Sequence, residues 1–515
     1  MMMRSVRMAS RVACGLLLSV LTGCGGGDGG GGGTGGAAGS AGSGGSGGGA
    51  ASGGQGGSGG SAGSGGSAGS GGSAGSGGSA GSGGSAGSGG SATGGSGGSA
   101  TGGSGGSATG GSGGSATGGA AGLGGPRIGA EIHVNTTLPQ DQEHPQVAMA
   151  DDGRFVVVWM SRGQAGGTTS ELYGQRFNAN GTKAGGELQI SSTKASSLYY
   201  GPDAYDVAMA PDGRFVVAWS GYGSADRKLY AQAYDATGAK TGSQQVVDDT
   251  TDMWTEYQVS VAMNKAGEFT VLFDWEKGFT AGAKARQYTA TATPKAAAFW
   301  VTNKRRVHDV DLACNEAGDL VAVWRYYDTD TEVFGQRIAA GGTLSGSELA
   351  VNTSTKSGQN QPSVALRGDG SFAVVWQSQH ASPNPTQGIY AQLFDKSSSK
   401  AGAELAVSLA TSGSMEQPGV AIDATGRWVV TWSNDGGPVA GNGDEVWAQR
   451  FNADGTRPEP TFRVNTFDTN DQNDSRIAMA SGGRFVIVWS DHRQEEVVGG
   501  NTTDDAGVFA QLFQP

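Results

Sequence analysis

The chain has 515 residues, a net charge of −12 and 98 glycines, most of which lie in the first 125 residues. Those 125 residues contain three arginines and one aspartate, so residues 126–515 carry a net charge of −14. An acidic surface without basic clusters argues against nucleic acid and anionic membrane surfaces as partners. The single cysteine of this part, Cys314, excludes a disulfide within it.

The first 23 residues have the organisation of an export signal. Three arginines precede the apolar run 12–21, which is too short to span a bilayer as a helix. Residues 21–24, Leu-Thr-Gly-Cys, resemble a bacterial lipobox. The resemblance implies cleavage before Cys24, a lipid on its thiol and, because Gly25 rather than Asp follows, the outer membrane. Which side of that membrane the protein faces is left open, and the alternative is an ordinary secretory signal with an incidental cysteine.

Residues 24–125 form a second zone of Gly, Ser, Ala and Thr repeats. Apart from Cys24, no side chain apolar and larger than alanine occurs before Leu123, so nothing offsets the entropy of ordering this segment. The composition predicts a disordered linker with a root-mean-square span of about 50 to 60 Å.

Residues 126–515 contain seven repeats, each marked by a glycine followed six residues later by a large aromatic residue. The aromatic residues recur every 51 to 60 residues, which is the length of one small sheet. The seven pairs are Gly153/Trp159, Gly213/Trp219, Gly267/Phe273, Gly318/Trp324, Gly370/Trp376, Gly426/Trp432 and Gly483/Trp489.

Each repeat has the order of a four-stranded blade, which is clearest at residues 147–190. Segments 147–150, 155–159, 172–177 and 187–190 are rich in strand-forming residues, and turns containing Gly, Asn or Asp separate them. The second segment lacks polar alternation, as expected of a strand buried on both faces. We therefore predict an all-β, seven-bladed propeller of antiparallel blades, monomeric and without a cofactor or bound metal.

Two further residue types recur at equivalent positions in every repeat, and we call each such set of positions a column. An alanine in the first strand suits the crowded axis, at positions 148, 208, 262, 313, 365, 421 and 478. A glutamine in the third strand is expected to bond neighbouring backbone at a blade interface, at positions 175, 232, 287, 336, 392, 449 and 511.

The last repeat stops after its third strand, at residues 508–515. Its missing fourth strand is predicted to be supplied by residues 127–136, which match the fourth-strand endings at 347–353 and 461–466. This arrangement would close the ring and leave no open terminal edge.

The repeat as a whole resembles tandem β-propeller repeats of bacterial surface and secreted proteins, often found behind a lipobox and a Gly/Ser tether. The shared pattern is VA..DGRFVVVW...LYGQRF..NG...E..VNT, and it covers residues 127–515, with the third repeat the most divergent. Members of this group are mostly without assigned activity.

Function is expected on the face that carries the connections between strands two and three and between blades, because these connections vary in length. Aromatic residues gather there and could bind a sugar or a protein, or could instead fill gaps between blades. These candidates are Tyr199, Tyr200, Tyr222, Trp254, Tyr257, Trp275, Tyr326 and Tyr327.

Acidic groups around Asp328, Asp474 and Asp491 lack the spacing of a calcium loop and are interpreted as a solvated rim.

The sequence contains no catalytic motif. The five histidines lie apart, no G-x-S-x-G motif occurs in residues 126–515, and Cys314 lies in an apolar column. The preferred hypothesis is a lipid-anchored, non-catalytic binding module for a glycan or protein. The alternative is a hydrolase or lyase acting on extracellular carbohydrate through acids such as Asp328, Asp474 or Asp491. Carboxylates and a basic residue converging at the mouth of the axial channel would favour the alternative.

Overall fold

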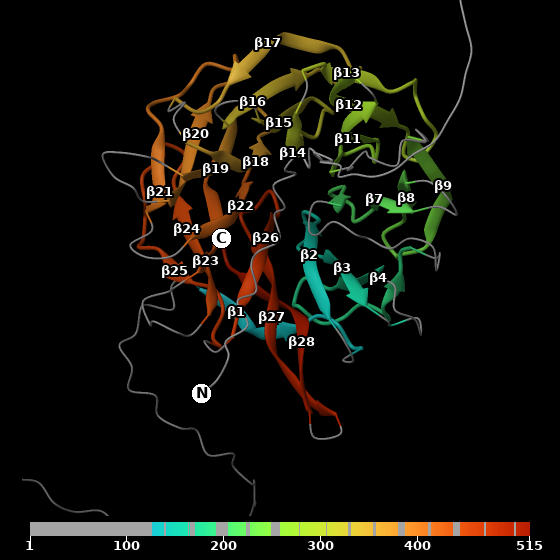
Figure 1. The fold of residues 1–515 in the computed structure, drawn as a ribbon, viewed down its shortest axis with the longest axis vertical. Helices are drawn as coiled ribbons and strands as arrows, with labels where there is room; N and C mark the ends of the chain where they lie inside the picture. Colours follow the sequence, from blue (N-terminus) through green and yellow to red (C-terminus); the bar gives the residue numbers. More distant parts are fainter. Residues whose placement is uncertain are drawn as a thin grey trace, which may run out of the picture. The chain divides into compact units, whose positions relative to one another are not determined.

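A computed structural model describes residues 126–137, 141–162, 164, 170–191, 204–222, 227–248, 258–277, 279–304, 306–327, 331–353, 357–379, 387–409, 414–435, 443–467, 470–498 and 501–515. These residues form seven antiparallel four-stranded sheets arranged as the blades of a propeller (Figure 1). Blade 1 is β2-β3-β4-β5, and blades 2 to 6 follow in the same manner up to β22-β23-β24-β25. Blade 7 has the order β1-β28-β27-β26.

The strands have the following bounds. They are β1 Arg127–His133, β2 Gln142–Met149, β3 Phe155–Arg162, β4 Ser170–Phe177, β5 Leu188–Gln189, β6 Tyr205–Met209, β7 Phe215–Tyr222, β8 Arg227–Tyr234, β9 Lys240–Asp248, β10 Val259–Met263, β11 Phe269–Lys277, β12 Thr280–Tyr288, β13 Phe299–Thr302, β14 Val307–Cys314, β15 Leu320–Tyr327, β16 Thr331–Ile338, β17 Leu344–Ala350, β18 Gln359–Leu366, β19 Phe372–Gln379, β20 Gln387–Phe394, β21 Leu405–Leu409, β22 Met415–Ile422, β23 Trp428–Asp435, β24 Asp444–Phe451, β25 Phe462–Arg463, β26 Gln472–Met479, β27 Phe485–Val498 and β28 Asn501–Phe513.

The predicted seven-bladed fold is confirmed. The first strand of each blade lies at the axis and the fourth at the rim, as β2 and β9 illustrate in Figure 1. The innermost strand of blade 1 begins at Gln142, five residues before the predicted start at Val147. This added stretch is polar and contains a bulge, so its pattern does not indicate a strand.

The recurring aromatic residues fill the wedges between blades. Trp159 is fully buried and packs in one cluster with Val486 and Val508 of blade 7. Trp324 packs likewise with Leu272 of blade 3. A wide ring at this position therefore joins each second strand to the blade before it.

The recurring glycine has two structural reasons, which Gly213 illustrates. Its φ is +91°, a value that residues with a Cβ rarely adopt. A Cβ there would also lie 2.9 Å from the Arg154 guanidinium of the preceding blade. That guanidinium donates a hydrogen bond to the carbonyl of Asp212 at 2.9 Å. The turn glycine thus leaves room for an arginine that joins two blades.

The glutamine column bonds backbone, but mostly within its own blade. Gln336 Nε2 donates to the carbonyls of Arg337 and Ser345, both at 3.0 Å. The register of β16 and β17 shifts next to this point, between Gly335 and Arg337. The expected blade-interface role is therefore wrong for Gln336, which ties its third strand to its fourth. Gln287 is different, because it donates to Ala340 of the next blade at 3.1 Å.

The N-terminal strand closes the last blade, as predicted. β1 pairs with β28 in antiparallel register, from Arg127 opposite Phe513 to His133 opposite Phe509. The hydrogen bond from Gln514 N to Pro126 O, at 2.9 Å, extends this pairing beyond the strand. The two ends of the described chain therefore meet in one sheet.

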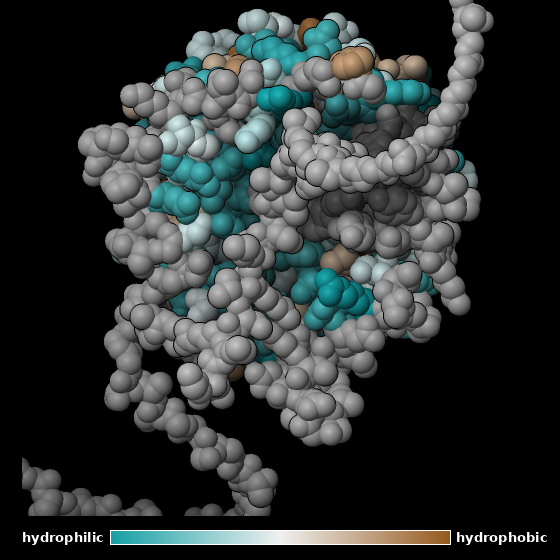
Figure 2. Space-filling view, in the orientation of Figure 1, coloured by the Kyte–Doolittle hydropathy of each residue, from teal (hydrophilic) through white to brown (hydrophobic). Residues whose placement is uncertain are grey.

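The face shown in Figure 2 is mainly hydrophilic where described residues are visible. A few hydrophobic patches occur near the outer strands at the top of the view. Among the described residues, no helix is long and apolar enough to cross a membrane.

Candidate functional site

A belt of polar side chains surrounds the axis where the innermost strands begin. Five belt residues occupy equivalent bulge positions and have a φ between 50° and 57°, namely His144, Asp309, Gln361, Gln417 and Asp474. A non-glycine residue rarely adopts this conformation, and it turns the strand locally out of register. Because innermost strands begin at the end where strands two and three connect, this axial belt lies on the variable face.

The belt joins blades 6, 7, 1 and 2. Gln417 Oε1 accepts from Asp474 N at 2.9 Å, and Gln417 Nε2 donates back to the Asp474 carboxylate. The other oxygen of Asp474 lies 2.6 Å from His144 Nδ1. The hydroxyl of Tyr205 then donates to the His144 carbonyl.

The same pattern continues through blades 3, 4, 5 and 6. Gln258 and Asp309 exchange two bonds, of which Nε2 to Oδ1 measures 3.3 Å. Gln361 N donates to Asp309 Oδ2 at 3.1 Å, and Gln417 N donates to Gln361 Oε1 at 2.8 Å. The described belt therefore links each blade to the next from blade 3 round to blade 2.

Blades 2 and 3 are joined one layer deeper. Val261 N donates to Asp206 Oδ2 at 2.8 Å, and Ser260 Oγ lies 3.0 Å from the same oxygen and 3.1 Å from Asp311 Oδ1. One serine proton cannot serve both carboxylates. Burial, with a contribution from Asp311, raises the pKa of Asp206 to about 6. A proton on Asp206 therefore completes this contact below about pH 6.

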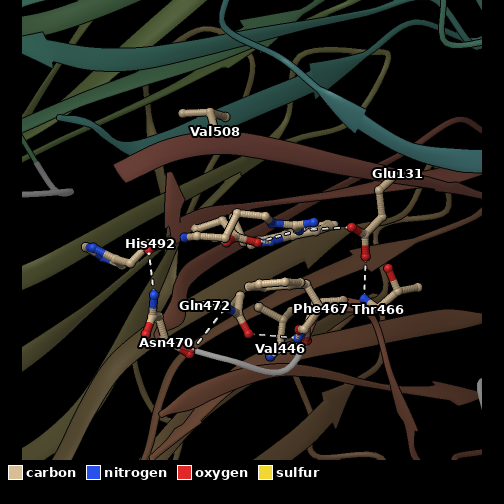
Figure 3. Close-up of polar contacts among 12 residues, drawn as sticks. Glu131, Val446, Thr466, Phe467, Asn470, Gln472, His492 and Val508 are labelled. Carbon is tan, nitrogen blue, oxygen red and sulfur yellow. Dashed lines mark hydrogen bonds and ion pairs between the residues drawn. The ribbon is translucent and has the colours of Figure 1, made fainter. Parts of the chain in front are cut away.

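Two asparagines, each located just after the fourth strand of its blade, hold belt residues in position. Asn465 accepts a hydrogen bond from Val446 N at 3.0 Å and donates to Gln472 Oε1 at 2.9 Å (Figure 3). Gln472 in turn donates to the carbonyl of Asn470 at 3.2 Å. We call these three hydrogen bonds the asparagine clasp. Asp474 lies two residues after Gln472, so the clasp fixes the start of β26, from which Asp474 projects.

The same clasp positions the partner of Asp474. Asn135 accepts from Val508 N at 2.8 Å and donates to Gln142 Oε1 at 2.9 Å. His144 lies two residues after Gln142. Equivalent clasps in neighbouring blades thus hold both members of the His144 and Asp474 pair.

A carboxylate at the rim completes the junction of blades 6 and 7. Glu131 of the closing strand accepts from Thr466 N and from Arg493 Nη2, the latter at 2.9 Å (Figure 3). Arg493 also bonds Asp491 Oδ2 at 2.5 Å. These contacts anchor β1 to two other segments of the ring.

His144 and Asp474 form a largely buried ion pair. Their side chains are 22% and 9% exposed. Burial acts to lower the pKa of His144, but the Asp474 carboxylate and Glu143 outweigh it, so this pKa is raised. Burial acts to raise the pKa of Asp474, but His144 and Arg476 outweigh it, so this pKa is lowered. Each of these shifts favours the charged form of its group.

Glu143 is the carboxylate with the most open surroundings in this cluster. Its side chain is 15% exposed, 4.0 Å from His144 Nε2 and 3.6 Å from Arg162 Nη2. Burial raises the pKa of Glu143, while the charges of His144 and Arg162 oppose the shift. We call Glu143, His144, Tyr205, Asp474 and Arg476 the axial cluster.

The axial cluster contains the carboxylates and basic groups that a hydrolase would need, but most of them already have partners. Asp474 accepts from His144, Gln417 and Ser490. Two-carboxylate hydrolysis requires that both acids reach the substrate. Glu143 meets this condition better than Asp474, so the cluster supplies one less engaged acid beside the His144 imidazole.

The described aromatic candidates do not form one platform. Trp275 packs edge-on against Trp300 at 5.3 Å and has the Lys284 ammonium 3.4 Å from its ring centre. Tyr326 packs edge-on against Phe334 at 6.3 Å. Both ring contacts lie within one blade, so they do not decide between ligand binding and the filling of gaps between blades. Tyr327 differs, because it is 52% exposed.

Other candidates lie outside the described residues. They are Cys24, Tyr199, Tyr200, Trp254, Tyr257 and Asp328. Tyr222 ends β7, but only its backbone is described.

The interpretation of the acidic groups as a solvated rim is wrong for two of them. Asp474 and Asp491 are buried. Asp491 accepts from the Trp489 indole at 3.1 Å as well as from Arg493. Buried carboxylates of this kind join segments of the fold. In the described part of the chain, no group of three or more His, Cys, Asp or Glu is placed to hold a metal ion.

The axial belt was not predicted, although the sequence contains a signal for it. A polar residue stands four positions before the innermost alanine in six of the seven repeats, and Ala204 takes this place in blade 2. The belt residues differ in type, so no single letter marks the column. Aligning the repeats on that alanine would have revealed it.

Comparisons with known proteins give no family for this chain. No family model matches it, and no curated protein matches it. Many solved structures are similar, and the following three illustrate the low identity. A protein of unknown function from Dyadobacter fermentans is 12% identical, with 76% of this chain and 100% of that chain covered and a TM-score of 0.45. An α-L-arabinanase from Penicillium chrysogenum, in complex with arabinobiose, is 13% identical over 75% of this chain and 99% of that chain, with a TM-score of 0.42. An ulvan lyase is 7% identical over 74% of this chain and 95% of that chain, with a TM-score of 0.48. The blade count rests on the strands of this chain itself.

Proposed function

We propose that this protein is a non-catalytic binding module of the cell envelope whose ligand is a glycan bound on the variable face. The observation that supports this proposal is the engagement of the charged axial groups. His144, Asp474 and Asp309 are all used to join blades. Groups that hold the scaffold together are poorly suited to exchange protons with a substrate.

Tyr327 supplies the described surface for such a ligand. It ends β15 on the variable face, and the Arg325 guanidinium lies 6.0 Å from its ring centre. Arg325 is itself fixed by Asp309 at 3.0 Å and by Asn360 at 3.0 Å. An exposed ring beside a fixed donor is suited to stack on a sugar and bond its hydroxyls.

A glycan array with the purified protein tests this proposal. Tyr327→Ala is expected to weaken binding of the recognised glycan by about 5- to 30-fold, corresponding to loss of one aromatic contact. Leu344→Ala is the matched control, because Leu344 is also exposed but follows a turn on the opposite face. A glycan bound equally by both variants, or no glycan bound at all, would contradict the proposal. A protein bound through Tyr327 would replace the glycan as ligand.

The second candidate is a hydrolase or lyase acting on extracellular carbohydrate. It is favoured by Glu143, whose raised pKa suits a general acid and whose carboxylate lies 4.0 Å from the His144 imidazole. In this case Glu143→Gln abolishes polysaccharide cleavage while glycan binding remains. Absence of cleavage by the wild-type protein across plant, algal and bacterial polysaccharides would exclude this candidate.

We also propose that Cys24 carries the lipid anchor and that residues 24–125 tether the propeller to the outer membrane. The support is the signal-like segment before Cys24 and the composition that follows it. A Cys24→Ser variant is expected to lose incorporation of a labelled fatty acid and to leave the membrane fraction. Unchanged labelling of this variant would refute the anchor.

A further inference from the structure

A pocket of about 250 Å³ lies between blades 6 and 7, on the face opposite the axial cluster. Arg450 and Phe451 line it from the end of β24, and Glu459 from the turn that follows. Phe485 and Met479 of blade 7 form the opposite wall. Arg427 and Asp423 also line the pocket, and they are paired with each other at 2.7 Å. The pocket therefore combines two guanidinium groups, two carboxylates and apolar surface.

Arg450 has two counterparts, which show what its position normally binds. Arg176 and Arg337 follow the recurring glutamine in blades 1 and 4, as Arg450 does in blade 6. Arg176 Nη1 donates to the carbonyl of Ala236 at 3.2 Å. Arg337 Nη2 donates to the carbonyl of Asp395 at 3.2 Å. Both acceptors belong to the turn between strands three and four of the next blade.

No such turn faces Arg450. The third and fourth strands of blade 7, β28 and β1, come from opposite ends of the described chain. Arg450 Nε lies 3.0 Å from Glu459 Oε1 of its own blade. Its Nη2 is buried and has no hydrogen-bond partner among the described residues. A buried donor without an acceptor is costly, so this position favours an added acceptor.

We propose that this pocket binds a small carboxylate-bearing ligand about the size of one sugar ring. Its oxygens would take the place that turn carbonyls occupy at Arg176 and Arg337. A carboxylate suits the guanidinium because the two can form parallel hydrogen bonds. The pocket is smaller than the roughly 300 to 1,000 Å³ of typical sites for drug-sized ligands, which limits the ligand to this size.

Two neighbouring groups shape the site. Glu459 is 30% exposed, so its side chain can turn toward solvent when a ligand carboxylate replaces it at Arg450. The Arg450 guanidinium lies over the Phe485 ring, with Cζ 4.9 Å from the ring centre, and this contact helps to hold the guanidinium in place. This site is independent of the ligand proposed for the variable face.

Titration of the full protein with D-glucuronate, followed by saturation-transfer NMR, tests the proposal, with D-glucose as the uncharged isostere. We expect saturable binding of D-glucuronate alone. Arg450→Leu is expected to weaken it by about 10- to 100-fold, the range for a hydrogen bond to a charged group. Arg450→Lys keeps the charge without the paired donors and should bind at an intermediate level. Glu459→Gln removes the internal competitor and should bind more tightly than wild type.

Arg176→Leu is the matched control. It removes an arginine that already has its turn carbonyl, so it should lower the melting temperature and leave glucuronate binding unchanged. Equal binding of glucose and glucuronate, no saturable binding, or binding unaffected by Arg450→Leu and by Arg450→Lys would each overturn the proposal. If Arg450→Leu does not fold, the Arg450→Lys and Glu459→Gln results decide between these outcomes.

Discussion

His144 and Gln417 show how one position can serve the same structural purpose with different side chains. Both adopt a left-handed conformation and both bond the Asp474 of blade 7. The glutamine does so as a neutral amide, whereas the imidazole does so as a cation. The junction of blades 7 and 1 is therefore an ion pair. Farther round the ring, the junction of blades 5 and 6 is formed at this position by uncharged groups instead, the Gln361 amide and the Gln417 backbone.

This difference predicts a pH dependence for the junction of blades 7 and 1. The pKa of His144 is raised above 6.5, so its stabilising charge is complete below that value and is lost as the pH rises through the folded-state pKa. The pKa of Asp474 is lowered below 3.8, so its contribution is lost only in strong acid. His144→Gln should therefore flatten the fall in unfolding free energy between pH 6 and pH 9.

Urea unfolding at pH steps across this range measures the effect. Glutamine fits the position, since Gln361 and Gln417 occupy its equivalents. His492→Gln is the control, because it removes an imidazole outside the belt. If wild type and His144→Gln give parallel curves, the pair contributes nothing to the pH dependence.

At the scale of the strand, the third and fourth strands of each blade need help to stay paired. Their registers shift in most blades, and in blade 1 the fourth strand has only two residues, Leu188–Gln189. A glutamine amide that donates to the backbone of both strands compensates for the missing ladder bonds. The backbone-bonding role of the glutamine column was predicted from its recurrence. Whether each amide bonds its own blade or the next could not be predicted, because a single sequence does not show which carbonyls a bulge leaves free.

Gln336→Leu tests this role. It leaves two partly buried carbonyls without their donor, and we expect a loss of about 1 kcal/mol in unfolding free energy, seen as a lower melting temperature. Gln244→Leu, on an exposed position of β9, should change it little. A Gln336→Leu variant with the full melting temperature would mean that water replaces the amide.

For the whole molecule, the sequence predicts the ring far better than the site. Blade number, strand order and closing strand follow from Gly153, Trp159 and their repeats, because backbone and packing needs recur in every unit. Tyr327 could be placed on the variable face from sequence, but its exposure and its neighbour Arg325 could not, and Arg450 could be assigned no environment. Their surroundings depend on which blades meet and on where the ring is closed, which is a property of the assembled fold.

Closure of the ring by β1 predicts that a protein without this strand can be restored by adding the strand as a separate peptide. A protein lacking residues 1–137 exposes the edge of β28, so it should melt at a lower temperature and self-associate. A synthetic peptide of residues 126–137 should restore the melting temperature in a concentration-dependent manner. The same peptide carrying Ile128→Asp and Ile132→Asp is the control, because both isoleucines pack on the core.

Differential scanning fluorimetry of the shortened protein, with and without peptide, provides the measurement. An unchanged melting temperature after removal of residues 1–137 would show that β1 contributes no stability. Rescue by both peptides would show that the effect is not specific pairing.

The position of β1 also decides where mechanical force acts. Residues before Pro126 connect directly to the closing strand. Pro126, which immediately precedes this strand, accepts a hydrogen bond from Gln514 N. Tension arriving along the chain from that side therefore loads the seam between β1 and β28 before it reaches any blade made from one continuous segment. We therefore expect the unfolding rate of this seam to set the resistance of the protein to pulling, and the hydrogen bond between Glu131 and Arg493 to lower that rate.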